Sequence, residues 1–184
     1  VSEVELEIGG QRIDRHYGHW MQIWSDLTEF NPNGHLGTTG AQTTLGNGTG
    51  TLFQRMTGTG VGINGGDVNT AAHPKIFIPL QFWFCRNPGL ALPLIALQYH
   101  EVKVKLNIQT SGKLCGGGTL TMNTLDLYCD YIYLDTDERR RFAQVSHEYL
   151  IEQVQYSSNS VTSGSSNSID LNFNHPVKEI VWQF

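Results

Sequence analysis

The chain has 184 residues and a formal net charge of −5, from 12 Lys and Arg against 17 Asp and Glu. A chain of this length can bury about 70% of its unfolded surface in one compact core, so no disulfide or metal is needed to hold the fold. The acidic balance argues against a nucleic-acid surface, because phosphate binding draws on clustered Lys and Arg.

The first predicted elements are a strand and a short helix. Apolar and acidic residues alternate over residues 4–8, which predicts a half-buried strand closed by Gly9-Gly10. Apolar residues then recur at helical spacing, which predicts an amphipathic helix over residues 15–28 with Asp14 as its candidate cap. The apolar stripe consists of Tyr17, Trp20, Ile23, Trp24 and Leu27. Its two tryptophans could form a ligand box, but packing against a sheet is the favoured interpretation.

Residues 31–73 are rich in Gly, Thr and Asn, which predicts a long exposed loop, because such a segment buries little apolar area. Residues 52–53 and Met56 are the candidates to pin it. Residues 60–65 spell GxGxxG, but a dinucleotide site requires a strand before this motif and a helix after it, and neither is predicted. Residues 47–49 spell a glycosylation sequon at Asn47.

The most apolar stretch follows this loop. Residues 75–84 carry apolar side chains on both faces of an extended chain, which predicts a strand buried on both sides. Residues 86–89, Arg-Asn-Pro-Gly, end it in a turn. Alternation returns over residues 99–109, which predicts a strand with one dry and one wet face.

Residues 120–134 are predicted to form a long strand in which Cys129 is a small buried residue. Residues 135–144 place acids before three arginines, which suits the dipole of a short helix better than a phosphate-binding patch. Residues 147–156 and 169–173 read as further strands, followed by a final strand up to residue 184. Both ends of the chain fall in strand patterns, so we expect an internal segment of a longer protein.

A search for chemistry finds no constellation that predicts a reaction. Cys85, Cys115 and Cys129 are widely spaced, which indicates neither a disulfide framework nor a zinc site and fits a reducing compartment. His16 and His19 could share a helix face as metal ligands, but a third ligand is missing nearby. No nucleophile elbow, Walker loop or cupin-type His cluster occurs, and no apolar run approaches the ~20 residues of a membrane helix. We therefore predict no catalytic residue, no cofactor and no metal site, and a protein that is not an enzyme.

Four blocks of the chain occur in the order found in one known family. They read VELEIGGQRID, IPLQFWFCRNPGLALPLIALQYHEVKV, YIYLDTDERRRFAQVSHEYLIEQ and NFNHPVKEIVW. Together they resemble the major capsid protein of nucleocytoplasmic large DNA viruses, nearest to its algal-virus and iridovirus-like branch. Without this resemblance, the pattern predicts only an all-β antiparallel sandwich with short helices.

The resemblance implies a jelly-roll fold in which two barrels follow each other. Residues 1–134 would be the later strands of the first barrel, including loop 31–73, residues 135–145 a connector, and residues 146–184 the opening strands of the second. It also implies a virion protein, assembled inside the host cell as homotrimers that tile an icosahedral shell. Its partners would be neighbouring capsomers and minor capsid proteins, with no direct nucleic-acid binding. The alternative is a carbohydrate-binding β-sandwich module.

Overall fold

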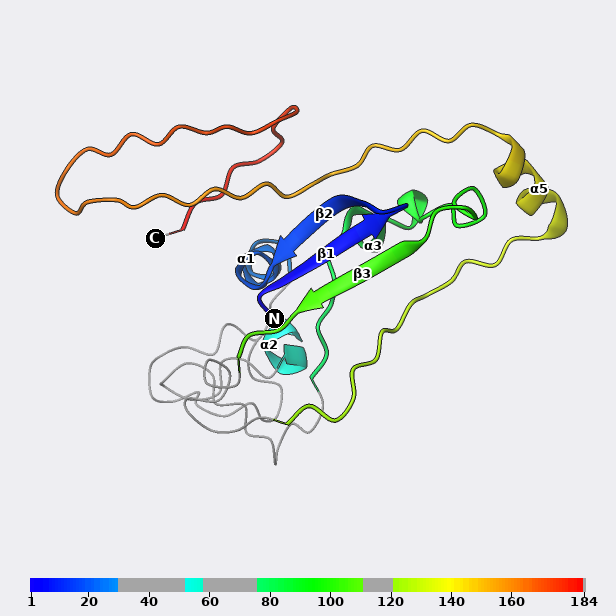
Figure 1. Ribbon diagram of the computed structural model, residues 1–184, viewed down its shortest axis with the longest axis horizontal. Helices are drawn as coiled ribbons and strands as arrows, with labels where there is room; N and C mark the ends of the chain where they lie inside the picture. The colour runs from blue at the N-terminus through cyan, green and yellow to red at the C-terminus, as the bar shows by residue number, and fades with distance from the viewer. Residues whose placement is uncertain (30–51, 58–75, 111–120, 184) are drawn as a thin grey trace.

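The computed structural model describes residues 1–29, 52–57, 76–110 and 121–183 (Figure 1). Three strands and several short helices occur among them, in the following order. They are β1 (Glu3–Ile8), β2 (Gln11–Tyr17), α1 (Gly18–Thr28), α2 (Leu52–Thr57), α3 (Trp83–Arg86), the 3-10 turn η1 (Pro88–Leu90), β3 (Val102–Asn107) and α5 (Thr136–Gln144).

The strands form one antiparallel sheet in the order β2-β1-β3. In its centre Leu6 of β1 lies opposite Asp14 of β2 and Val104 of β3. Gly9 and Gly10 have φ of 60° and 82°, a backbone conformation that residues with a Cβ rarely adopt. The two glycines therefore make the tight turn between β1 and β2. The predictions of strands at residues 4–8 and 99–109 are confirmed, the second with narrower bounds.

The helix predicted over residues 15–28 begins later than expected. Residues up to Tyr17 belong to β2, α1 starts at Gly18, and its cap position is Tyr17. Asp14 is therefore not a cap but a buried residue in the middle of β2. The helical spacing of Tyr17 misled the prediction, because the buried side of β2 carries Asp14 and His16 in place of the apolar residues that mark a strand.

The core lies between the sheet and the helices that cover it. Five apolar residues of the described part of the chain are buried: Val4, Leu6, Met21, Phe82 and Trp83. Half-buried side chains surround them, among them Phe53 of α2, so the expectation that residues 52–53 pin the Gly-rich segment is confirmed for Phe53. The predicted exposed loop is wrong at residues 52–57, which form α2; the rest of it, with Asn47 and the GxGxxG motif, lies outside the described residues, as does Cys115.

The strand predicted at residues 75–84 is wrong in the part that the structure describes. Residues 76–82 form no ladder, the Phe77 N–H donates to the Met56 carbonyl, and Trp83 begins α3. A strand would point Phe82 and Trp83 to opposite faces, whereas here both are buried in one core. The alternation predicts the apolar character correctly, but within the described residues no neighbouring strand pairs with this segment.

The strands predicted at 120–134, 147–156 and 169–173 are also absent from residues 121–183 of the structure. These residues run as extended chain on both sides of α5 (Figure 1). The prediction that Cys129 is buried is wrong, because this residue is exposed, and Tyr133 is 96% exposed. A strand needs a paired neighbour, and within the described part of the chain these segments have none.

The helix predicted at residues 135–144 is confirmed as α5. The Asp135 carboxylate caps it by accepting a hydrogen bond of 2.8 Å from the Glu138 N–H. Asp137 and Glu138 occupy its first turn and Arg141 its last, as the dipole argument requires.

Candidate functional site: the junction of β2 with residues 152–156

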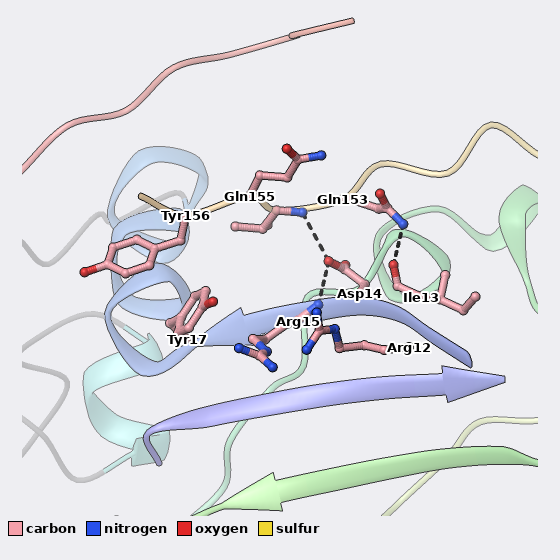
Figure 2. A pocket seen from close by; sticks show the side chains of 9 residues that line it. Arg12, Ile13, Asp14, Arg15, Tyr17, Gln153, Gln155 and Tyr156 are labelled. Carbon is pink, nitrogen blue, oxygen red and sulfur yellow. Dashed lines mark hydrogen bonds between the residues drawn. The ribbon is translucent and has the colours of Figure 1, made fainter. Parts of the chain in front are cut away.

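Residues 152–156 run beside β2, although about 140 positions separate the two in sequence (Figure 2). The Gln153 side-chain amide donates a hydrogen bond to the Ile13 carbonyl. The Val154 N–H donates to Asp14 Oδ1 at 3.1 Å. The rings of Tyr17 and Tyr156 meet at 4.9 Å between centroids. The junction thus joins the sheet to the extended chain after α5.

Asp14 and His16 form a buried polar pair beneath this junction. They lie two residues apart in β2, so both side chains point to the same face of the sheet. They are only 3% and 2% exposed, and Asp14 Oδ2 lies 2.9 Å from His16 Nε2. This contact lacks the alignment of a hydrogen bond. The His16 ring also packs on Phe82, with centroids 4.6 Å apart, so the pair borders the apolar core.

The two arginines of β2 are committed to glutamates of β1. Arg15 Nε donates to Glu5 at 2.8 Å, and Arg12 reaches the same oxygen at 3.3 Å. The hydrogen bond from Arg15 lowers the pKa of Glu5. Hydrogen bonds with Tyr17 and then Glu5 raise the pKa of Arg15. These guanidiniums therefore link β2 to β1, and carboxylates compensate their charges.

A second contact lies at the other end of the junction. Arg86 of α3 pairs with Glu152 at 3.0 Å, and Lys178 donates to the same carboxylate at 2.5 Å. The Arg86 guanidinium also lies 4.7 Å over the ring of Trp24 in α1. The hydrogen bond from Lys178 lowers the pKa of Glu152, and the charge of Arg86 adds to the shift while partial burial opposes it.

The hollow between β2 and residues 153–156 has a volume of about 320 Å³ and is lined by both segments. Nothing in its lining forms a metal centre: the described residues contain no group of three or more His, Cys, Asp or Glu placed to hold an ion. His16 and His19, the candidate ligands on one helix face, do not share one, because His16 is buried in β2 while His19 is exposed on α1. In the part of the chain that is described, no helix is long and apolar enough to cross a membrane.

Sequence reasoning missed every residue of this junction. The sequence pattern predicts Asp14 as a helix cap and Arg86 in a turn, and it places Glu152 and Val154 in a strand. The local signal for a buried Asp14 is its spacing of two residues from His16, which places both side chains on one face of a strand. Its contact with residue 154 has no signal in the local pattern.

Two family models match the chain in succession. The model described as the major capsid protein N-terminus matches residues 1–135. The model described as the large eukaryotic DNA virus major capsid protein matches residues 138–184. Between them they leave out only the first residues of α5.

Individual proteins give the same result. The chain is 50% identical to the major capsid protein of Pyramimonas orientalis virus, over 99% of this chain and 41% of that protein. It is 45% identical to that of Phaeocystis pouchetii virus, over 99% of this chain and 39% of that protein. A solved structure, the quasi-atomic model of the PBCV-1 virus capsid, is 35% identical with a TM-score of 0.57, over 96% of this chain and 40% of that chain. The chain thus spans about two fifths of the length of these relatives.

Proposed function

This chain belongs to the major capsid proteins of large eukaryotic DNA viruses, and from that membership we propose that it is part of a protein that builds the outer shell of such a virus. The observation that carries the proposal is the succession of the two family models over residues 1–135 and 138–184. The homologues are structural components of virion capsids. The proposed role is therefore structural, without a catalytic residue, cofactor or metal.

The proposed organisation is a double jelly roll. Residues 1–134 are assigned to the first barrel, residues 135–145 to a connector and residues 146–184 to the second barrel. The change of family model between residues 135 and 138 supports this division. So does α5, an exposed capped helix at that position. The antiparallel sheet of β1, β2 and β3 supplies the β-rich character that the assignment requires.

The proposed assembly is a homotrimer with a pseudo-hexagonal outline that tiles an icosahedral shell. Many large apolar side chains are exposed in the extended chain around α5, including Leu125, Tyr133, Leu150 and Trp182. Apolar surface of this extent favours coverage by further protein over coverage by nucleic acid, and the net charge of −5 points the same way. Neighbouring capsomers and minor capsid proteins are the proposed partners.

The carbohydrate-binding alternative needs open aromatic faces on one surface. Trp83 is instead buried in the core, and the Arg86 guanidinium lies over the ring of Trp24. These two positions count against a sugar platform.

The mass of the protein in solution tests the assembly. We expect the product of the complete coding sequence to give three times the monomer mass by light scattering, and a hexagonal outline by negative-stain microscopy. A strict monomer at micromolar concentration would refute the trimer. Salt-dependent binding to DNA in the nanomolar range would instead refute the purely structural role.

A further inference from the structure

We propose that β2 and Arg86 form a docking surface for residues 152–156 of the same chain, and that Asp14 fixes the register of this docking. The surface would set how the part of the chain after α5 lies against the sheet. The inference rests on contacts within one chain, so it goes beyond the proposed shell function and does not depend on the trimer.

The position of β2 in the sheet makes it available for docking. The sheet order β2-β1-β3 leaves β2 at an edge, where unpaired backbone groups ordinarily add another strand through a regular ladder. Residues 152–156 meet this edge through side chains instead. The Asp14 carboxylate accepts a hydrogen bond from the Val154 N–H, and the Gln153 side-chain amide donates one to the Ile13 carbonyl. Two consecutive residues of each segment are thus matched, and a shift by one residue would break both bonds (Figure 2).

The hydrogen bond from Val154 stabilises the buried Asp14 carboxylate more than it would stabilise an exposed one. A carboxylate at 3% exposure is costly unless donors replace the lost water. Its Oδ1 accepts from the Arg15 N–H at 2.8 Å and from the Val154 N–H, while Oδ2 has only the unaligned contact with His16. Removing residues 152–156 would leave Oδ1 with one donor in place of two. The burial of Asp14 and the docking of Val154 therefore stabilise each other.

Arg86 gives the surface its charge complementarity. The Arg86 side chain is 21% exposed and its guanidinium lies over the Trp24 ring, so less side-chain freedom remains to be lost when Glu152 binds. Glu152 and Val154 are half-buried while Gln153 and Gln155 are exposed, as expected when one face of an extended segment lies against a surface. The side chains of Glu152 and Val154 thus lie on the same face of the extended segment.

Hydrogen exchange at the Val154 amide tests the proposal in the product of the complete coding sequence. Asp14→Ala removes the acceptor, and a hydrogen bond to a charged group is strong enough that exchange should rise about tenfold or more. Asp14→Asn keeps a carbonyl oxygen at the Oδ1 position and should raise exchange less. Unchanged exchange in Asp14→Ala would overturn the proposal.

Exchange of the β1 amides shows whether Asp14→Ala unfolds the sheet. If it does, a matched pair of glutamine variants tests the docking instead. The Gln153 side chain donates to the Ile13 carbonyl, whereas the Gln155 side chain donates to the Asn174 carbonyl and accepts from the Asn174 N–H, away from β2. We expect Gln153→Ala to raise exchange at residues 152–156 several-fold, and more than Gln155→Ala does, with β1 unchanged in both. Equal effects of the two variants would show that β2 does not hold the segment. Trimer mass is a separate readout, so failure here and failure of the shell proposal are distinguishable.

Discussion

Truncation of Phe82 should destabilise the sheet more than the change in hydrophobicity alone predicts. Phe82 is 1% exposed, lies 4.6 Å from the His16 ring and stacks on Phe84 at 5.8 Å. Loss of a core phenylalanine side chain costs about 3–5 kcal/mol, since the cavity adds to the lost burial. Among the described residues the core has five buried apolar side chains, so few neighbouring side chains can move in to close the cavity. We therefore expect Phe82→Ala to fall near the upper part of that range.

Native-state hydrogen exchange of the β1 amides measures this loss, because it reports opening of this sheet whatever the oligomeric state. At about 1.4 kcal/mol per factor of ten, the expected acceleration is between about 100-fold and several thousand-fold. Phe82→Leu is the matched control, since it keeps most of the apolar volume and should cost less than about 1.5 kcal/mol. Acceleration below tenfold in Phe82→Ala would refute the assignment of Phe82 to the core.

Three further predictions concern the junction, α5 and the chain as a whole. Because the pKa of Glu152 is lowered in the folded state, its contribution to docking is present above the ordinary glutamate pKa of about 4.3 and is lost as the pH falls through the lowered value. Exchange at residues 152–156, corrected for the intrinsic pH effect, should rise on acidification, and Glu152→Gln should make this rise smaller. Asp135→Ala should destabilise α5 by about 1 kcal/mol through loss of its cap, while Asp135→Ser should restore most of it; equal exchange of the α5 amides in both variants would contradict the cap. The 184-residue chain expressed alone should not behave as a stable soluble monomer, because side chains such as Leu150, at 80% exposure, have no cover in the described part of the chain. A sharp monomer peak in size exclusion with one cooperative thermal transition would contradict this.

Some elements were predictable because their signals are local. Alternation over residues 4–8 marks β1, and the Gly9-Gly10 pair marks the turn that follows it. The Asp135 cap, with acids in the first turn and Arg141 in the last, marks α5 within one residue of its bounds. In each case neighbouring residues determine the conformation, through side-chain periodicity, backbone freedom or satisfaction of end groups.

Tertiary structure decided the rest. Residues 75–84 have the alternation of a strand, but whether they become one depends on a hydrogen-bonding neighbour that the local pattern does not encode, and Trp83 instead enters a helix. β2 has that neighbour in β1 and becomes a strand despite the polar Asp14 and His16 on its buried side. The junction shows the same dependence, because Asp14 acquires its role only when Val154 is brought to it across 140 positions of sequence. Periodicity records which side chains can share a face, whereas pairing and burial of polar groups depend on what the fold places opposite them.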